Sequence, residues 1–419
     1  MTILKIRSIL IFILTVCLIL GVSAAVIAYG RGYRVDVRKN SLKPTGLISA
    51  TSDPVGAQVL VDNQLKTATN NSFAIEPGWY TVRIIKESYI PWEKKIRVQG
   101  EVVTRADAFL FPTNPSLSPL TRTGMEQPVM SPDGSKIAYT IPLSVAEDGG
   151  GIVAAGLWYY ELSEAPLGRS RRPQLLAPST ASFNQSGSTL VWSPDSTQIL
   201  SIVGNRARLY TVGSNDTFEE ISQFQSLLSV WQRQHTTINL EKLAPFKPRF
   251  IDIATSSARI LAVSPDETKV LYEATSAATI PLIIEPALIG TNPTQDSRSI
   301  EPKKLYVYDS REDKNYFLLD RSELPPNPPR ADRADTPVLP SYAQPSAIGW
   351  FPTNKHLLLT LPGKIDVMEY DRTNWTTIYA GPFVEGFVAP WPNSSRLVIV
   401  TNLNPSAGVL PNLYTVNLR

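Results

Sequence analysis

The sequence is poor in the residues that hold metal ions and form covalent cross-links. It contains one cysteine and two histidines in 419 residues. A single cysteine excludes an intrachain disulfide and a zinc finger or ribbon, and two histidines exclude most histidine-based metal sites. We therefore expect neither a metal nor a cofactor, and no residue stands out as a metal ligand.

An excess of charge of one sign is also missing. The chain has 40 Lys and Arg against 37 Asp and Glu, which gives a net charge of +3. Nucleic-acid-binding proteins usually carry a strongly basic face or tail, so no nucleic-acid partner is expected. Hydrophobic residues make up 43% of the chain, a share that excludes disorder over most of its length.

Motifs of catalysis are absent as well. The sequence has no Gly-x-Ser-x-Gly elbow, no phosphate-binding loop, no Gly-x-Gly-x-x-Gly and no His-Glu-x-x-His. His235 falls near the end of a predicted helix and His356 within a predicted strand, and a structural role is the favoured interpretation of both. The sequence therefore predicts no catalytic residue and a protein that is not an enzyme.

One long apolar run lies near the N-terminus. From Ile9 to Tyr29 there is no charged residue, and as a helix this span would measure about 32 Å. The hydrocarbon core of a bilayer is about 30 Å thick, so the run predicts one transmembrane helix. Residues 1–43 would form a short tail, this anchor and a basic juxtamembrane segment. Cys17 lies inside the run and is interpreted as an apolar residue of the helix.

The side of the membrane on which the bulk of the chain lies is open to two interpretations. Basic residues are more numerous after the helix than before it, and the positive-inside rule then favours a cytoplasmic bulk. A short basic tail ahead of an apolar run is instead typical of a signal anchor. The domain types below favour the second interpretation, so we expect a single-pass cell-membrane protein with an extracytoplasmic bulk. The basic residues after the helix are Arg31, Arg34, Arg38, Lys39 and Lys43.

Residues 44–112 alternate apolar and polar residues between turn signals, which predicts a small β-sandwich. The stretch 53–57, Asp-Pro-Val-Gly-Ala, resembles the opening of a PEGA domain, with Val55 in place of the glutamate. The stretch 77–82, Pro-Gly-Trp-Tyr-Thr-Val, resembles a later part of the same family. The resemblance implies a β module of cell-surface or envelope proteins, with no catalytic residues to carry over.

A self-similar phrase recurs through residues 113–419. Three copies contain Ser-Pro-Asp, at 131–133, 193–195 and 264–266, and two weaker copies surround Pro352 and Pro392. Each copy joins a tight turn to a β-rich stretch, and each is followed by a partner strand. A propeller blade of four strands needs about 40–50 residues, so the copies predict blades with insertions of different length.

The turn chemistry of the phrase supports this interpretation. Proline has a preset φ, aspartate bonds backbone amides and glycine takes a positive φ. The phrase resembles the repeats of TolB-type β-propellers, a WD-repeat-like class. The resemblance implies a propeller that binds partners, and the repeats predict about five to six blades.

Two insertions interrupt the repeats. Residues 216–243 have helical periodicity, with Asp216 or Thr217 as the expected cap, and we expect their apolar face to pack on the propeller. Residues 325–345 are rich in proline, which predicts an extended surface loop.

The candidate site residues within the repeats favour structural roles. Asp133, Asp195 and Asp266 occupy equivalent turns, so they should be spread around the ring. The tryptophans near the repeat turns could stack on sugars, but packing between blades is the favoured interpretation. The acidic stretch 309–315 could hold Ca²⁺, but a charged hairpin turn is favoured. These tryptophans are Trp192, Trp350 and Trp391.

The expected protein is mainly β: an N-terminal transmembrane helix, a PEGA-like sandwich and a propeller with a helical insertion. The expected function is non-catalytic binding or scaffolding at the cell envelope, for an envelope polymer or a protein partner. Two alternatives stay open. One is a glycan-active enzyme whose carboxylates come from distant blades. The other is a cytoplasm-facing, membrane-tethered sensor or adaptor. The sequence does not identify the ligand-binding residues.

Overall fold

The structure is a computed structural model that describes residues 2–30, 33–36, 41–143, 154–165, 169–170, 172–214, 217–326, 337–403 and 410–419. Asp216 and the middle of the proline-rich insertion, residues 327–336, lie outside the described residues. The chain divides into two compact units. The first comprises residues 1–110 and 284–294, and the second comprises residues 111–283 and 295–419.

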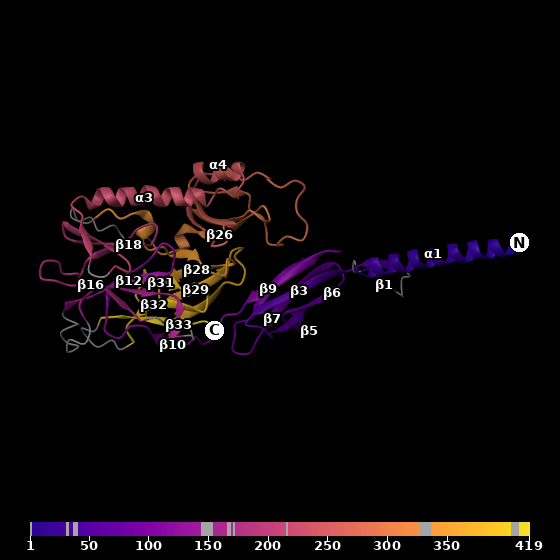
Figure 1. Ribbon diagram of the computed structural model, residues 1–419, viewed down its shortest axis with the longest axis horizontal. Coiled ribbons are helices and arrows are strands. Elements are labelled where there is room, and N and C mark those ends of the chain that lie inside the picture. The colour runs from indigo at the N-terminus through magenta and orange to yellow at the C-terminus, as the bar shows by residue number, and fades with distance from the viewer. Residues whose placement is uncertain are drawn as a thin grey trace. The chain divides into compact units, whose positions relative to one another are not determined.

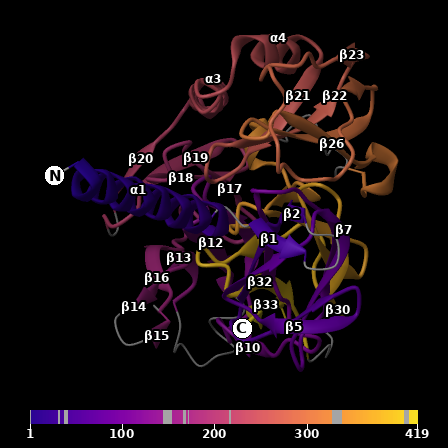
Figure 2. The ribbon, with the colours of Figure 1, turned by 90° about the vertical axis from the view of Figure 1, so that its right-hand side faces the viewer.

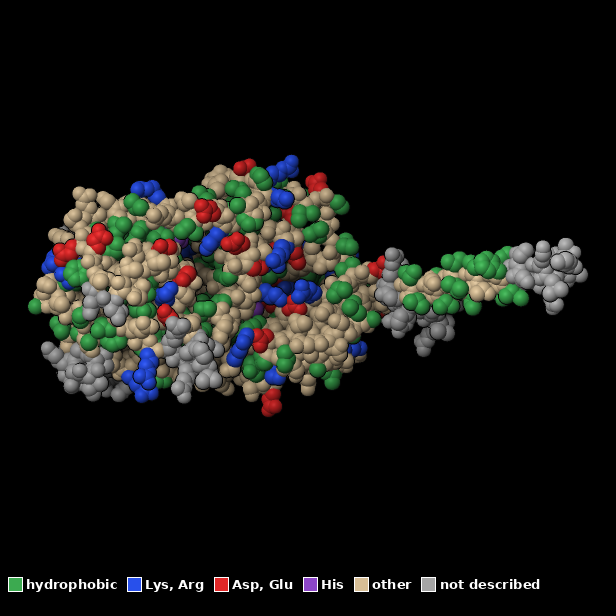
Figure 3. Space-filling model, in the orientation of Figure 1, with side chains coloured by type: hydrophobic (Ala, Val, Ile, Leu, Met, Phe, Trp, Pro, Cys, Tyr) green, Lys and Arg blue, Asp and Glu red, His purple; other side chains and the backbone are tan. Residues whose placement is uncertain are grey.

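The first unit begins with helix α1, Thr2–Gly30. Its described side chains, residues 11–27, are all exposed, and hydrophobic groups cover this stretch (Figure 3). The chain is thus helical over the predicted span from Ile9 to Tyr29. Among the residues that the structure describes, however, no helix combines the length and the apolarity that crossing a membrane requires.

A short hairpin, β1 (Tyr33–Asp36) with β2 (Ser41–Pro44), precedes a two-sheet module. One sheet has the order β6 (Asn71–Ile75), β3 (Gly46–Asp53), β9 (Val103–Phe109), and β3 and β9 are parallel. The other has the order β5 (Gln64–Ala68), β4 (Gln58–Val61), β7 (Gly78–Ile85), β8 (Trp92–Val98).

Alternate residues of these strands face one shared core. Ile48, Val59, Val82, Ile84 and Ile96 are all buried in it. Because successive side chains of a strand point to opposite faces, each buried residue is followed by one that faces away from the core. The predicted small β-sandwich is therefore present.

The second unit contains five four-stranded antiparallel sheets in its described residues, numbered here as blades one to five (Figure 1). Blade one is β11 (Glu126–Met130), β12 (Lys136–Ile141), β13 (Gly156–Glu161) and β16 (Gln174–Pro178). Blade two is β17 (Thr189–Trp192), β18 (Gln198–Val203), β19 (Arg206–Thr211) and β20 (Phe218–Glu220). Blade three is β21 (Ala258–Val263), β22 (Lys269–Ala274), β25 (Lys304–Asp309) and β26 (Lys314–Asp320). Blade four is β27 (Ile348–Trp350), β28 (His356–Leu361), β29 (Lys364–Glu369) and β30 (Thr376–Ala380).

Blade five closes the ring with strands from both ends of the unit. Its strands are β31 (Val388–Pro390), β32 (Arg396–Thr401), β33 (Asn412–Asn417) and, outermost, β10 (Leu117–Pro119). Leu117 pairs with Val416 and Pro119 with Tyr414. The first strand of the unit thus completes the last blade, and the described strands form a propeller.

The repeat turns have one geometry in all five blades. Their fourth residue has a positive φ in every copy, whether it is glycine or not. The two copies without aspartate keep the turn, and in the last one Asn393 Oδ1 accepts a hydrogen bond from Ser395 N at 3.0 Å. The φ angles are 71° at Gly134, 61° at Ser196, 53° at Glu267, 61° at Asn354 and 62° at Ser394.

Most neighbouring blades pack directly, but blades two and three are separated by helices. Side chains of blades one and two form one apolar cluster, as do those of blades five and one and of blades three and four. Helix α3 (Phe224–Glu241) instead packs Leu228 and Trp231 on blade two. Helix α4 (Pro248–Ser256) packs Phe250 on blade three. In Figure 2, α3 is drawn above the strands of blade two and α4 above β21 and β22 of blade three.

The helical insertion begins later than its periodicity predicts. Residues Phe218–Glu220 form strand β20, and α3 starts at Phe224, so Thr217 is not its cap. Strand β20 pairs with β19, and Arg208 binds Glu220 at 3.1 Å. Pairing at the open edge of blade two thus overrides the local helical pattern. The predicted packing of the apolar helix face on the propeller is confirmed.

Candidate binding site

The long connections of the propeller gather at one end of its strands. In an antiparallel blade, the turns between strands one and two and between strands three and four lie at the same end. The connections between strands two and three, and those leading to the next blade, lie at the other end. Insertions gathered on one face are typical of a binding face. In the described part of the chain, this end holds residues 142–143, 154–155, 221–257, 275–283, 295–303, 321–326, 337–347, 402–403 and 410–411.

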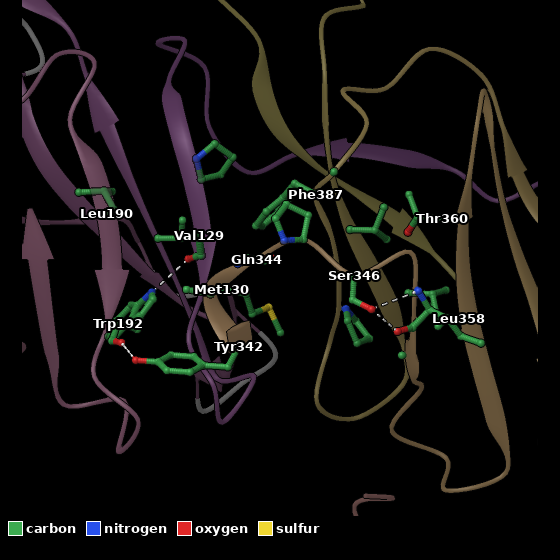
Figure 4. A pocket seen from close by; sticks show the side chains of 18 of the residues that line it. Val129, Met130, Leu190, Trp192, Tyr342, Gln344, Ser346, Leu358, Thr360 and Phe387 are labelled. Atoms are coloured by element: carbon green, nitrogen blue, oxygen red, sulfur yellow. Dashed lines mark hydrogen bonds between the residues drawn. The ribbon is translucent and has the colours of Figure 1, made fainter. Parts of the chain in front are cut away.

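A cavity of about 280 Å³ lies among the innermost strands (Figure 4). Its walls come from β11, β17, β27, β28 and β31, and residues 342–346 complete them. Large apolar and aromatic side chains dominate the lining, and Figure 4 shows the rings of Trp192, Tyr342 and Phe387 around it. Strands far apart in the sequence therefore build one site, which the sequence alone did not identify.

The lining of this cavity carries no Asp, Glu, Lys, Arg or His. Its polar side chains are those of Tyr342, Gln344, Ser346 and Thr360. The Tyr342 hydroxyl donates to Trp192 O at 2.8 Å, and Ser346 Oγ donates to Ile348 O at 2.7 Å. Burial, with the nearby charge of Asp195, raises the pKa of Tyr342, so its phenol stays protonated at neutral pH. The site offers contact area and a few hydrogen bonds, but no acid–base pair.

Two of the predicted tryptophans join neighbouring blades beside the cavity. The indole Nε1 of Trp192 donates to Val129 O at 3.1 Å, and that of Trp350 donates to Ala262 O at 3.4 Å. Both bonds run from an inner strand to the inner strand of the preceding blade. Trp192 is 2% exposed, and buried Trp391 lies edge-on to Tyr160 with ring centroids 6.3 Å apart. These contacts fit the packing interpretation rather than sugar platforms.

The aspartates of the repeat turns are not brought together. Each bonds within its own turn, as Asp195 Oδ1 does with Ser193 Oγ at 2.5 Å and Thr197 Oγ1 at 2.9 Å. Burial alone would raise the pKa of Asp195, but these hydrogen bonds outweigh it and the pKa lies below its usual value. Asp133 and Asp266 show the same pattern. These carboxylates hold turns in shape.

The two histidines also lie apart from the cavity wall. His235, on α3, stacks on Tyr342 with ring centroids 4.5 Å apart, and burial, with the charge of Lys242, lowers its pKa. His356 is buried in β28, where its Nδ1 and Thr353 Oγ1 are 2.8 Å apart. Neither ring lines the cavity.

The acidic stretch 309–315 is the hairpin between β25 and β26. Buried Asp309 accepts from Arg311 N at 2.8 Å and lies 3.8 Å from Lys269 Nζ, and burial raises its pKa. Asp313 is paired instead with Arg298 at 3.3 Å. Over the described ranges, no three His, Cys, Asp or Glu side chains are grouped so that they could hold a metal ion.

The end of the proline-rich insertion is not the surface loop that its composition predicts. Leu339 and Ala343 pack in the apolar cluster of blade two, beside α3. Residues 342–346 then reach the cavity. The sequence feature that could have indicated this packing is the pair of large side chains, Leu339 and Tyr342, among the prolines. We call α3 together with residues 337–346 the wedge.

Comparison with known proteins identifies the small domain. Residues 45–114 match the PEGA domain family, so this part of the chain is a PEGA domain and the resemblance in its sequence is confirmed. No curated protein matches the chain.

Solved structures similar to this chain include two TolB structures. The putative TolB from Agrobacterium tumefaciens is 12% identical, with 70% of this chain and 78% of that one covered and a TM-score of 0.21. TolB from Acinetobacter baumannii is 11% identical, with coverages of 81% and 59% and a TM-score of 0.22. An oligogalacturonate lyase from Vibrio parahaemolyticus is 8% identical, with coverages of 73% and 94% and a TM-score of 0.29. With TM-scores this low, the propeller assignment rests on the sheet topology and ring closure of the chain itself.

Proposed function

We propose that this protein is a membrane-attached envelope protein that binds a partner through its propeller and catalyses no reaction. The observation that carries the proposal is the cavity among the inner strands. Its aromatic and apolar lining suits an uncharged segment of a ligand, with Gln344 and Thr360 as polar groups that orient it. Hydrolysis or elimination of a glycan needs carboxylates or another acid–base pair, and this lining contains none.

Attachment to a membrane is supported by α1. The exposed side chains on its described part include Phe12, Leu14 and Leu18, and apolar surface of this extent is unfavourable in water. Burial in lipid would remove this surface from water. The presence of a PEGA domain, which the sequence resemblance links to cell-surface or envelope proteins, favours the extracytoplasmic side, where the partner would be an envelope polymer or a protein.

The cavity can be blocked without disturbing its walls. Gly349 lines it from β27, and a Cβ at this position would have no atom within 4 Å. We expect Gly349→Phe to fill the cavity and to abolish capture of the partner by the full-length protein cross-linked in intact cells. Ala380→Phe is the matched control, because Ala380 is exposed at the end of the outer strand of the same blade.

Two outcomes would contradict the proposal. If Gly349→Phe captures the same partner as Ala380→Phe, the cavity is not the binding site. If the purified protein cleaves an acidic polysaccharide such as polygalacturonate, and Gly349→Phe stops the cleavage, the site is catalytic. Protection of the domains from protease on intact spheroplasts, lost on lysis, would contradict the extracytoplasmic location.

A further inference from the structure

The chain enters the PEGA domain from α1 at one end of the sandwich. Gly46, the first residue of β3, packs against Val98 and Gln99, so closely that a Cβ on Gly46 would collide with them. Thr45 O accepts a hydrogen bond from Glu101 N at 3.1 Å. The turn at 99–102 therefore lies at the end where the connection from the helix arrives.

A tryptophan and two cations occupy the outer face of the sandwich at this same end. Gly78 pairs with Val98 beside Gly46, and the next pair along the strands is Trp79 with Arg97. Ile96 and Val98 face the core, so the alternate residues Lys95 and Arg97 face outward. Trp79 lies opposite Arg97 on the neighbouring strand and faces outward as well. The Trp79 side chain is 53% exposed. Its ring centroid lies 5.6 Å from Lys95 Nζ and 6.0 Å from Arg97 Cζ.

The protein does not neutralise these two cations. Over the part of the chain that the structure describes, neither Lys95 nor Arg97 forms an ion pair, whereas Arg83, farther along the same face, lies 3.7 Å from Glu93. Glu76 and Glu101 also lie near this end, but in the described structure neither forms an ion pair with Lys95 or Arg97. The positive charge beside Trp79 is therefore available to an anionic partner.

A loop that interrupts the propeller sequence adds apolar side chains to this end of the PEGA domain. Residues 284–294 belong to the first compact unit, and Gly290 N donates to Gln99 Oε1 at 2.9 Å. Gly290 has a φ of 71°, and a Cβ there would lie 2.7 Å from Val102 Cγ1, so glycine suits this contact. The preceding residues Leu288 and Ile289 are 45% and 74% exposed.

We propose that this end of the PEGA domain is a contact surface for an anionic phospholipid bilayer. The surface, called here the basal patch, consists of Trp79, Lys95, Arg97, Leu288 and Ile289. Tryptophan and cations are the side chains that favour the headgroup region, and exposed aliphatic side chains beside them insert into its apolar border. The proposal rests on the membrane attachment of α1 proposed above.

The length and charge of the connection favour a bilayer over other anionic partners. The residues between Gly30 and Gly46 span at most about 50 Å when fully extended, so a chain held by α1 keeps the patch near the lipid. The same connection carries an excess of basic residues over Asp36 in the sequence. Each cation near an anionic surface adds to the attraction, which salt weakens.

The test reconstitutes the full-length protein in vesicles of phosphatidylcholine alone, or of an equal mixture with phosphatidylglycerol, whose acyl chains carry bromine as a quencher of tryptophan. Helix α1 contains no tryptophan, so the anchor adds no signal. The measured quantity is the quenching that Trp79→Phe removes. We expect it to be at least about twofold larger with phosphatidylglycerol and to fall at high salt.

Matched variants assign the effect to the patch. Lys95→Gln with Arg97→Gln should remove the dependence on phosphatidylglycerol, and Leu288→Ser with Ile289→Ser should reduce the quenching of Trp79. Val55→Ser is the control, because Val55 is exposed and follows the end of β3 opposite to Gly46. Circular dichroism of each variant monitors folding.

The outcomes separate this proposal from the one on which it rests. Loss of the protein from vesicles in an alkaline wash would contradict attachment through α1. Retention with no quenching assigned to Trp79, or equal quenching in both lipids, would overturn the basal patch alone. Abolition of the quenching by soluble polygalacturonate would also overturn it, because the face would then prefer an anionic glycan.

Discussion

The joints between the blades are of two kinds. Blades one and two meet directly through buried side chains such as Tyr159, Leu190 and Trp192, and an indole-to-carbonyl bond crosses between them. Blades two and three share no such apolar cluster in the described residues: the wedge packs on blade two, helix α4 packs on blade three, and side-chain amides tie the two segments of the wedge together. Gln225 Nε2 donates to Val338 O at 3.0 Å, and Gln232 Oε1 accepts from Ser341 N at 2.6 Å.

This difference indicates which part of the ring opens at the lowest free energy. The direct joints bury large apolar surfaces and repeat from blade to blade, so they contribute to the stability of the whole unit. The two segments of the wedge are far apart in the sequence, and besides Leu339 and Ala343 in the cluster of blade two they are held by hydrogen bonds that lie partly in solvent. Segments of this kind open locally at a lower free energy than the core. The predictions below test this contrast.

Trp192→Ala should have the largest effect. It removes a buried indole from the joint of blades one and two and leaves a cavity, which costs about 3–5 kcal/mol of the free energy of unfolding. Urea denaturation of the full-length protein measures the loss. Trp192→Phe is the control, since it keeps most of the packing and lacks the bond to Val129 O. A loss below about 1 kcal/mol in Trp192→Ala would show that the direct joint is not the main stabilising contact.

Gln232→Ala should act locally on the wedge. It removes the acceptor of Ser341 N, and because this amide is exposed and water can replace the bond, the cost is about 0.5–1.5 kcal/mol. Hydrogen exchange at residues 339–343 should then become about tenfold faster, while the urea midpoint of the blades stays unchanged. Gln234→Ala, an exposed change on the same helix, is the control. A drop of the global midpoint equal to the local effect would mean that the wedge and the blades open together.

Glu267→Gly should stabilise blade three slightly. Glu267 has a φ of 53°, a conformation that costs a residue with a side chain about 1 kcal/mol relative to glycine. The reciprocal change, Gly134→Glu, should destabilise the equivalent turn of blade one by a similar amount. Glu267→Ala is the control and should give no gain, because it keeps the positive φ. Thermal denaturation measures all three, and equal midpoints for glycine and alanine at 267 would contradict the argument.

The sequence predicted the regular parts of the fold from local signals. The proline turns indicated the repeats even at Pro352 and Pro392, where aspartate is missing, because the following strands keep their β-rich pattern. The start of α3 could not be predicted, since strand β20 is decided by pairing with β19 rather than by residues 218–220 themselves. Ring closure could not be predicted either, because Pro119 pairs with Tyr414 at the far end of the chain, a contact that no local pattern indicates.

The candidate site could not be predicted either, because its lining comes from segments that are far apart in the sequence. Met130, Trp192 and Trp350 were visible in the repeats, and the packing of the tryptophans was predicted from their place before the turns. Residues 342–346 reach the cavity because Leu339 and Ala343 pack in the apolar cluster of blade two. No local sequence pattern indicates this packing. Proline content indicates an extended backbone, but it does not indicate which surface such a backbone contacts.

The wedge and the turns should also lose stability in different pH ranges. The pKa of His235 is lowered, first by burial and then by Lys242, so the unfolded chain binds a proton more readily than the folded one. Stability from the wedge is therefore complete well above the usual histidine pKa of about 6.5 and declines as the pH falls below it. The turn aspartates have lowered pKa values, so their contribution declines only below the ordinary aspartate value of about 3.9.

The groups that face His235 are Tyr342, stacked on it, and Asn239, 3.4 Å from its Nδ1. Hydrogen exchange across residues 224–241 at pH 7 and pH 5 should show faster opening at pH 5, and His235→Phe should remove the difference. The same acceleration in His235→Phe would assign the effect to another group.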